Sequence, residues 1–595
     1  METSKSLMEK VMVCEKGDRI PFCPAIYEHK GFLIGKSPSE ICRDADLLVA
    51  GILKEREIYQ PDFLTVGIDV YNVEAEALGC EVIYFDDSDD VPGVEKPIIS
   101  TADDLARLAI PNPQTDGRMP LYLEAAKRIQ AEVGHEVTVR GAISGPLSMA
   151  SELVGAENFI VLTLQDPAFV RQLLKFTSEV AAEFGKAFIA LGLDPIIFDS
   201  RAMPPLCSPS VFKDMVAPTY AKHLIPVLKG AGAKHIPLVI GGDTTSILDD
   251  LQATGCTQLL CDFEGDRDKF MAASLEHNFP FRVNVDPRLL HLGPVEKIKD
   301  FTMEILNKCW DHPGFLLGTG VAAYNCPIEH LLAVRECLDA DYKNYVPKKS
   351  LAQKRKEEAE AIVADLRPGY DQDLDPVLRE MAEAIEEGDE DDVPELVEEA
   401  LADISPVEVV NKAMIPAMEV VGDRFSRNEI YVPEMLISAR AMKAGMVVVR
   451  PALVETGAKP IGNVLLGTVK GDIHDIGKNL VGMMLEGAGF EISDLGVNVP
   501  AERFVEEIKT SGIRILGLSA LLTTTMGYME KVIQALADAG LRDEVKVLIG
   551  GAPINDKYCD RIGADYYGES AADAVACAHD ALKSLKEAGV LSEAA

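Results

Sequence analysis

The chain has 595 residues, 47% of them hydrophobic and 26% charged, and this length predicts two to four domains. A formal net charge of -38 argues against nucleic acid as a partner, because phosphate binding needs clustered Lys and Arg. The twelve cysteines show no CxxC pair, so we expect reduced thiols and a cytoplasmic protein. The sequence has no apolar run of membrane-spanning length and no signal-peptide core, so we expect no membrane partner.

Residues 1–340 alternate apolar, β-rich runs with amphipathic helical stretches. Expected strands lie at 62–68, 136–139, 195–198, 238–240, 258–261, 281–284 and 314–317. Repeated βα units predict a parallel sheet closed into a TIM (β/α)8 barrel, with an open doubly wound sheet as the alternative. Polar residues at the expected strand ends would then converge on one face: Asp199, His235, Asp243, Asp262 and Asp286.

Residues 341–373 are charged and predict a linker, and residues 374–457 show helical periodicity only. Four helices are expected near 375–387, 393–402, 407–424 and 432–452, which predicts a small bundle. The acidic run Glu386–Asp403 indicates a solvated helix face. The last two helices carry five methionines, interpreted as core filler or, alternatively, as an apolar cover over a flat ligand: Met414, Met418, Met435, Met442 and Met446.

Residues 458–595 return to βα alternation. Expected strands lie at 461–469, 490–496, 513–521, 545–553 and 564–569, with helices between them. This pattern predicts a flavodoxin-like (Rossmann-type) open sheet, whose ligands bind beyond the carboxyl ends of the strands.

Three features fall at those strand ends. The first is "GDIHDIGKNL", which places His474 between Asp472 and Asp475, ahead of Gly477. The second is Ser519-Ala520-Leu521 followed by Thr523, and the third is the pair Gly550-Gly551. A carboxylate beside an imidazole sets its tautomer and basicity, and glycines leave bare backbone for a ligand. The combination suits a metal ligand beside a groove for a large cofactor.

The order DxHxxG…SxL…GG closely resembles the cobalamin-binding domain of corrinoid proteins and methionine synthase, over about residues 374–585. This resemblance implies that His474 ligates cobalt and displaces the lower base of the cofactor. It implies that Asp472 accepts a hydrogen bond from His474, with Ser519 behind. The remaining cofactor-binding residues that it implies are Ile473, Asp475, Gly477, Leu521, Thr523, Gly550, Gly551 and Gly568.

The segments "RGAISGPLSMASELVGAENF", "KHIPLVIGGDTTSILDDLQATG" and "NVDP" resemble the uroporphyrinogen decarboxylase superfamily, in its corrinoid-dependent methyltransferase branch. Decarboxylation of a porphyrinogen needs basic residues at the barrel mouth, and "GDRIPFCPAIYEHKG" lacks an arginine cluster. The resemblance also implies zinc bound by His-x-Cys and a later Cys. Here His235 is followed by Pro237, and Thr319 stands where the later Cys is expected. Zinc is therefore doubtful, and His235, Cys261 and Cys326 form the only rearranged set.

Without zinc, the methyl donor needs an activated leaving group or a general acid in the barrel. The candidates for the acid are Asp199, Asp286, His29 and His235, of which His235 and Asp286 match family positions. The resemblance implies a methyltransferase that moves a methyl group from a small donor (halide, methyl ether or thioether) to bound cobalt(I) corrinoid. A second methyltransferase would pass the group to a folate or thiol acceptor, and an ATP-dependent reductive activator would rescue oxidised cobalt.

Two other functions stay open. The first is a corrinoid carrier or sensor with an inactive barrel, which the proline at position 237 favours. The second is a methylcobalamin:thiol methyltransferase, which would require zinc.

Overall fold

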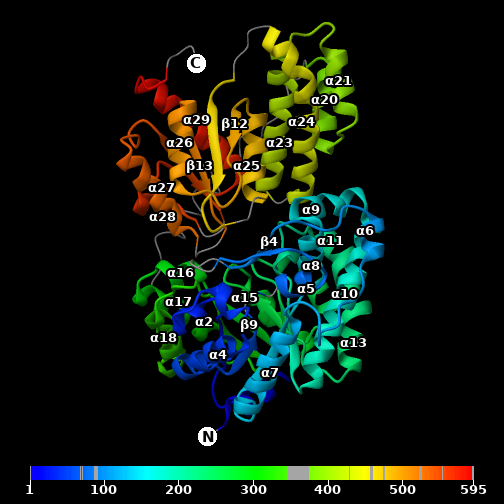
Figure 1. The fold of residues 1–595 in the computed structure, drawn as a ribbon, viewed down its shortest axis with the longest axis vertical. Helices are drawn as coiled ribbons and strands as arrows, with labels where there is room; N and C mark the ends of the chain where they lie inside the picture. The colour runs from blue at the N-terminus through cyan, green and yellow to red at the C-terminus, as the bar shows by residue number, and fades with distance from the viewer. Residues whose placement is uncertain are drawn as a thin grey trace. The chain divides into compact units, whose positions relative to one another are not determined.

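The computed structural model describes residues 2–67, 69, 71–85, 91–345, 374–427, 429–455, 460–472, 476–521, 525–551 and 554–591. The chain forms two compact units, Met1–Lys348 and Lys349–Ala595 (Figure 1). Most of the expected linker, residues 346–373, lies outside the described residues.

The first unit is built on eight parallel strands, and the predicted TIM barrel is confirmed. The strands are β1 (Phe22–Ala25), β2 (Phe63–Val66), β5 (Thr138–Ser144), β6 (Asp194–Phe198), β7 (Leu238–Val239), β8 (Leu259–Cys261), β9 (Phe281–Val285) and β10 (Phe315–Val321). They pair in the orders β2-β5-β6-β7 and β1-β10-β9-β8. The Leu238 amide donates to the Gln258 carbonyl at 3.0 Å, and the Asp62 amide donates to the Phe22 carbonyl at 2.9 Å. These bonds join the two halves at both seams, so the sheet closes.

Helices follow each strand and cover the outside of the barrel. The longer ones are α4 (Ala45–Tyr59), α7 (Met119–Val133), α10 (Pro167–Ala190), α15 (Arg267–His277) and α17 (Val295–Cys309). In α10 the side chain of Asp166 accepts from the Phe169 amide at 3.0 Å, and Pro167 occupies the first turn. Both features favour a helix start at this point. The helix then buries an apolar face that includes Leu173, Phe184 and Phe188.

The second unit begins with a helical bundle: α20 (Pro376–Glu387), α21 (Asp392–Ala400), α22 (Pro406–Val409), α23 (Ile415–Ser426) and α24 (Val432–Glu455). These helices lie close to the four predicted ranges. Met414, Met418, Met435 and Met442 are at most 3% exposed, so they pack in the bundle core. In the acidic run, α21 buries Val393 and Val397 and exposes its carboxylates, as a solvated helix face does.

The rest of this unit is a five-stranded parallel sheet in the order β12-β11-β13-β14-β15. Its strands are β11 (Asn463–Thr468), β12 (Glu491–Asp494), β13 (Ile515–Ser519), β14 (Lys546–Gly550) and β15 (Tyr566–Gly568). The order is that of the flavodoxin-like fold, which is confirmed, and it reverses direction between β11 and β13. Helices α25 (Ile476–Gly487) and α29 (Ala571–Glu587) pack together, and α26 (Ala501–Ser511) packs with α27 (Gly527–Asp538). Helix α24 of the bundle contacts α25.

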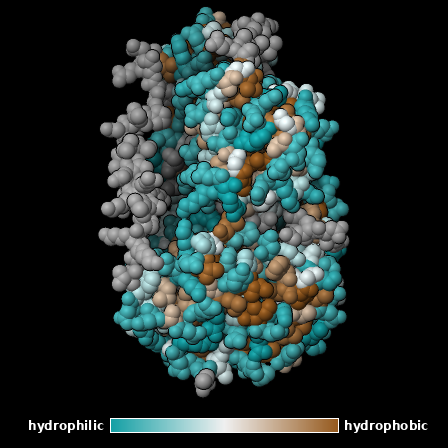
Figure 2. Space-filling model, turned by 90° about the vertical axis from the view of Figure 1, so that its left-hand side faces the viewer, coloured by the Kyte–Doolittle hydropathy of each residue, from teal (hydrophilic) through white to brown (hydrophobic). Residues whose placement is uncertain are grey.

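Figure 2 shows a mostly hydrophilic surface on which hydrophobic side chains gather in patches. Among the described residues, no single helix has the length and apolar character needed to cross a membrane. The bent helix pair Pro146–Val154 and Ala156–Gln165 meets those criteria only when its two parts are taken together.

Candidate functional site

The carboxyl edge of the second unit's sheet brings the sequence motifs into one row. Strand pairing aligns Thr468 with Ser519, Ser519 with Gly550, and Gly550 with Gly568. Asp472 follows β11 by four residues, and Leu521 follows β13 by two. Segments that are distant in the sequence therefore meet at the switch point, where ligands of such sheets bind.

Asp472 is the buried carboxylate of this edge, with 0% exposure. Its Oδ2 accepts a hydrogen bond from the Leu521 amide at 2.7 Å and one from the Thr525 hydroxyl at 2.6 Å. Its carbonyl accepts from the Asn498 amide at 2.9 Å. These bonds hold the carboxylate in one orientation. Sequence reasoning placed Ser519 behind Asp472 and missed Thr525, which stands at the end of a run of three threonines.

The glycines of the edge have two different environments. Gly551 has φ +126°, and a Cβ there would lie 1.9 Å from the Ala520 carbonyl oxygen. A Cβ on Gly550 would meet the Gly568 oxygen at 3.2 Å, and one on Gly568 would meet the Ala574 amide nitrogen at 3.1 Å. Close backbone approach therefore excludes a Cβ at Gly551, whereas at Gly550 and Gly568 the neighbouring backbone would have to shift by a few tenths of an ångström. Around Gly477, by contrast, a Cβ would meet no atom within 4 Å among the residues that the structure describes.

This edge fits a large cofactor. It offers strand ends without side chains at Gly550 and Gly551, a Cβ direction at Gly477 that no described residue fills, and the side chain of Leu521, which is 44% exposed. Four of the predicted cofactor-binding residues, Ile473, His474, Asp475 and Thr523, lie outside the described residues. The assignment of His474 as cobalt ligand stays a prediction.

In the barrel, Asp199 has a structural environment. It is 0% exposed, and its carboxylate accepts from the amides of Leu147 at 3.3 Å and Ser148 at 2.6 Å, in the first turn of α8 (Pro146–Val154). The Tyr220 hydroxyl donates to it at 2.7 Å. Burial raises the pKa of Asp199, and these hydrogen bonds oppose the rise. Asp199 thus caps a helix at the carboxyl end of β6.

The carboxylates after β7, β8 and β9 share that end of the barrel. Asp286 caps α16 (Pro287–Leu292) through the Arg288 amide at 2.8 Å, and it pairs with the Arg288 guanidinium at 3.1 Å. Asp262 accepts from the Gly242 amide at 2.9 Å and from Asn284 Nδ2 at 2.9 Å. Asp243 is exposed.

His235 does not join this group, and the expectation that it lies at the same face is wrong. Its amide donates at 3.0 Å to the carboxylate of Asp194, the first residue of β6, and its carbonyl accepts from Arg140 at 3.1 Å. Asp194 marks the amino end of β6, whereas Asp199 follows its carboxyl end. His235 therefore lies at the opposite end of the barrel, because it precedes the short strand β7 rather than following it.

The rearranged zinc set is not assembled. Cys261 ends β8, and Cys326 lies 3.5 Å from the Leu290 carbonyl oxygen, both at the other end from His235. In the described part of the chain, no three His, Cys, Asp or Glu side chains are grouped to hold a metal ion. Thr319, in place of the expected cysteine, accepts from the Ala25 amide at 3.0 Å through its hydroxyl oxygen.

His29, a candidate acid, is occupied by two partners. Its Nδ1 lies 2.7 Å from the Tyr324 carbonyl oxygen, and its Nε2 lies 2.7 Å from the Tyr59 hydroxyl. Because a carbonyl only accepts, Nδ1 carries the proton and Nε2 accepts from Tyr59. Burial lowers the pKa of His29 to about 4, so the ring is neutral at pH 7.

Two buried glutamates that sequence reasoning missed have pKa values suited to proton transfer at neutral pH. Glu28, which follows β1, is 9% exposed, and burial raises its pKa to about 7. Glu74, in α5 (Asn72–Ala77) after β2, also has its pKa raised by burial to about 7. Its carboxylate accepts from the Ser144 amide at 2.7 Å and the Ser144 hydroxyl at 2.8 Å. Glu74 follows the expected strand at 62–68, whereas β1 was not among the expected strands, so for Glu28 both the position after a strand and the burial were missed.

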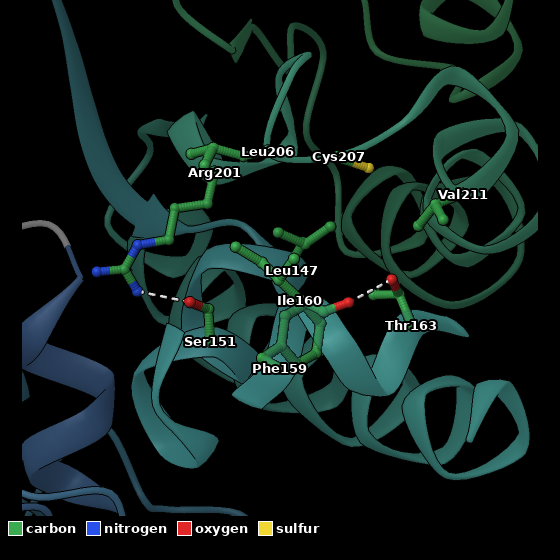
Figure 3. Close-up of a pocket in the computed structure, with 9 residues that line it drawn as sticks. All are labelled: Leu147, Ser151, Phe159, Ile160, Thr163, Arg201, Leu206, Cys207 and Val211. Carbon is green, nitrogen blue, oxygen red and sulfur yellow. Dashed lines mark hydrogen bonds between the residues drawn. The ribbon is translucent and has the colours of Figure 1, made fainter. Parts of the chain in front are cut away.

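Neither of two cavities in the barrel unit contains these carboxylates. The pocket in Figure 3 has about 10 Å³, room for about one water molecule, and Arg201 donates across it to the Ser151 hydroxyl at 2.8 Å. A hollow of about 780 Å³ is lined by residues such as Thr3, Pro61 and Val137. Pro61 and Val137 precede β2 and β5, so this hollow lies at the amino ends of the strands.

Known proteins resemble the two units separately. The family "Uroporphyrinogen decarboxylase (URO-D)" matches residues 3–340, and two B12 binding domain families match residues 462–576 and 377–450. Trimethylamine corrinoid protein 2 of Methanosarcina mazei is 43% identical over 210 residues, which are 35% of this chain and 96% of that protein. The dimethylamine corrinoid protein of Methanosarcina barkeri is 42% identical over 208 residues, 35% of this chain and 97% of that protein.

A solved structure shows the same fold as the larger part of the chain. It is a methyltransferase from Methanosarcina mazei, with 24% identity and a TM-score of 0.50, and the match covers 57% of this chain and 99% of that one. The chain therefore belongs to the uroporphyrinogen decarboxylase (URO-D) family, and it joins that barrel to B12 binding domains on one chain.

Proposed function

We propose that this chain transfers a methyl group from a small donor, bound at the barrel mouth, to cobalamin bound by the second unit. The observation that carries the proposal is the carboxyl edge of the second sheet, where buried Asp472 is held by Leu521 and Thr525 beside bare glycine backbone. Its fusion to a URO-D barrel supports catalysis on the same chain. When bound, cobalamin supplies a strongly nucleophilic cobalt(I) centre for methyl transfer.

The second unit's own residues would bind and orient the cofactor. Asp472 would fix the tautomer and raise the basicity of His474, the cobalt ligand that the family resemblance implies. Thr525 keeps the Asp472 carboxylate in place. Gly550, Gly551 and Gly568 keep the edge of the sheet free of side chains.

In the barrel, Glu28 would protonate the leaving atom of the donor. A carboxyl group with a pKa of about 7 is both protonated and acidic enough to donate a proton at neutral pH. Glu74 is the second candidate, but its two bonds from Ser144 favour the ionised form. Asp199 and Asp286 act as helix caps, and His235 lies at the far end of the strands.

The donated methyl group would pass onward to a folate or thiol acceptor on a second methyltransferase, and an ATP-dependent activator would restore reduced cobalt. The corrinoid proteins named above support a protein partner. The match covers 96% and 97% of their length, so they consist almost entirely of the part that corresponds to this chain's second unit.

The test uses the full chain reconstituted with cobalamin and reduced to cobalt(I) without oxygen. Methyl halides, aryl methyl ethers, thioethers and quaternary amines are added in turn, and the cobalt(I) absorption band is followed. We expect one class to consume the band, and Glu28→Gln to slow the reaction by about 100-fold or more if protonation limits the rate. If cobalamin binds and no donor consumes cobalt(I), the chain is a corrinoid carrier or sensor instead.

A further inference from the structure

Arg282 differs from the other buried arginines of the barrel unit because its charge has no counter-ion. Arg118 pairs with Asp69 at 2.7 Å, and Arg140 donates to the His235 carbonyl and lies 4.0 Å from Asp194. Arg282 is 2% exposed, and its Nε has no hydrogen-bond partner. Within the described ranges, no carboxylate forms an ion pair with its guanidinium. A buried charge without a partner is unfavourable, so a bound ligand is the natural source of one.

Arg282 lies inside the barrel together with Asn284, two residues further along β9. Side chains at positions i and i+2 of a strand point to the same face. A Cβ on Gly318 of the neighbouring strand β10 would lie 2.6 Å from Arg282 Cδ and 2.6 Å from Asn284 Oδ1. The absence of a side chain at Gly318 therefore makes the room that both residues occupy.

The positive charge of Arg282 acts on Cys23 within β1 and on Tyr27 beyond the carboxyl end of that strand. Burial raises the pKa of Tyr27, and the positive charge of Arg282 is the largest effect that opposes the rise. Tyr27 follows the carboxyl end of β1, and Asn284 Nδ2 donates to Asp262, which follows β8. Arg282 and Asn284 thus form the floor of the mouth.

Asn284 adds an unpaired hydrogen-bond acceptor beside the unpaired donor of Arg282. Its Nδ2 is used by Asp262 at 2.9 Å, whereas its buried Oδ1 has no donor. The floor therefore presents one unpaired cation with an N–H donor and, next to it, one unpaired acceptor. A ligand that satisfies both carries an anionic oxygen pair and an O–H or N–H group.

We propose that the barrel binds a methyl donor that carries a carboxylate, with the carboxylate on Arg282 and an adjacent O–H or N–H on Asn284 Oδ1. This inference rests on the proposed methyl transfer and adds its substrate class. A carboxylate anchored at the floor would leave the methyl-bearing end of the donor at the mouth, near Glu28 after β1. The planar guanidinium fork matches a carboxylate better than it matches a neutral group.

Binding can be tested without the reaction. Calorimetry on the full chain would measure the affinity for 4-hydroxybenzoate and for phenol, its neutral counterpart. The proteins compared are the wild type, Arg282→Met and Arg282→Lys. We expect the wild type to bind 4-hydroxybenzoate about 10- to 100-fold more tightly than phenol. Arg282→Met should abolish that preference, and Arg282→Lys, which keeps the charge, should retain part of it. Thermal unfolding provides a control, since Arg282→Met removes an unpaired buried charge and should not lower the melting temperature.

The kinetic arm compares 4-methoxybenzoate with methoxybenzene in the cobalt(I) assay, where Arg282→Met should raise the KM of the carboxylated donor only. Equal binding of the two probes, or a preference that survives Arg282→Met, would overturn the inference. So would an ordered water bridging Arg282 Nε and Asn284 Oδ1 with no probe bound at that position. If the carboxylate preference depends on Arg282 but no donor consumes cobalt(I), the anion site stands and the methyltransferase function fails. If the carboxylated donor reacts equally well in the wild type and in Arg282→Met, the function stands and this inference fails.

Discussion

The two units treat buried charge differently. The barrel unit buries many ionisable side chains, among them Lys30, Glu55, Asp69, Arg118 and Asp199. The second unit buries only Asp472 and Lys478 among its described charged residues, and Lys478 is paired with Asp494. In the barrel, most buried charged side chains thus form ion pairs or cap helices. In the second unit, the buried carboxylate of Asp472 lies at the edge where the sequence motifs meet.

This difference shows which buried groups are candidates for chemistry. A buried carboxylate that is matched by a cation or by amide donors is accounted for by the fold, as Asp69 and Asp199 are. Among the described residues Glu28 forms no ion pair, and burial raises its pKa to about 7 against the smaller opposing effects of a backbone hydrogen bond and the charge of Lys30. Arg282 is the corresponding case among the cations. The following predictions test whether this division holds.

The largest effect is expected for the buried pair Lys30–Glu55, whose Nζ and Oε2 atoms are 3.2 Å apart between α2 (His29–Ile34) and α4. Lys30→Met should lower the free energy of unfolding by roughly 3–5 kcal/mol at pH 8, because it leaves Glu55 buried without a counter-ion. Burial already raises the pKa of Glu55 to about 7, so at pH 6 the carboxyl takes up a proton and the loss should be smaller. Urea unfolding at the two pH values measures the difference.

The control is the double variant Lys30→Met with Glu55→Leu, which should recover most of the lost stability. If the single variant is as stable as the wild type at pH 8, the pair does not stabilise the fold. The distinction between paired, structural charges and unpaired candidates for chemistry would then fail in the barrel.

The next effect concerns Asp472. Asp472→Ala should lower the free energy of unfolding by roughly 2–4 kcal/mol, because the Leu521 amide and the Thr525 hydroxyl lose a charged acceptor. Cobalamin affinity should fall by about 10- to 100-fold, measured by equilibrium dialysis. Thr525→Val removes one of the two donors and should show a smaller change in the same direction. Unchanged cobalamin affinity in both variants would contradict the role of this carboxylate in positioning His474.

The sequence allowed much of this site to be predicted, because its motifs are contiguous and stand at the ends of strands. Gly550, Gly551 and Asp472 lie where the strand pattern placed them. Thr525 was missed because it lies in a turn ahead of α27 rather than in a periodic element, and its contact with Asp472 has no local sequence pattern. Which hydroxyl reaches inward depends on turn geometry that no local pattern specifies.

The barrel was predictable as a fold but less so as a site. His235 was misplaced because it was grouped with residues that follow strands, although the expected strand at 238–240 already put it before β7. The burial of Glu28 and Arg282 depends on packing between strands distant in the chain, such as the space left by Gly318 beside Arg282. Periodicity identifies the strands but not which interior group lacks a partner.

A smaller effect, on pH dependence, is expected at Glu28. The folded-state pKa is raised from 4.5 to about 7, so the folded protein holds a proton that the unfolded chain has already released in this window. Its contribution to stability is therefore full below about pH 4.5 and is lost as pH rises through about 7, up to roughly 3 kcal/mol at 1.36 kcal/mol per pKa unit. Relative to the wild type, Glu28→Gln should flatten the dependence of the unfolding free energy on pH, most visibly between about pH 5 and 7. Methyl transfer by the wild type should decline above about pH 7. If the unfolding free energy depends on pH equally in the two proteins, Glu28 is not the group with the raised pKa. Glu74→Gln would then be compared with the wild type in the same way.

The smallest effect on stability is expected at Asp286. Asn is as good a helix cap as Asp, so Asp286→Asn keeps the bond from the Arg288 amide and loses only a partly exposed ion pair with Arg288. The free energy of unfolding should change by about 0.2–1 kcal/mol, and cobalt(I) consumption should stay within a few-fold of the wild type. Because the fold is preserved, this variant distinguishes a helix-capping role of the Asp286 carboxylate from a catalytic role. A 100-fold slower reaction at unchanged stability would make Asp286 a catalytic residue, as its motif suggested. A carboxylate paired with a cation would then also serve chemistry, and the presence of a partner would no longer distinguish structural from catalytic groups in this barrel.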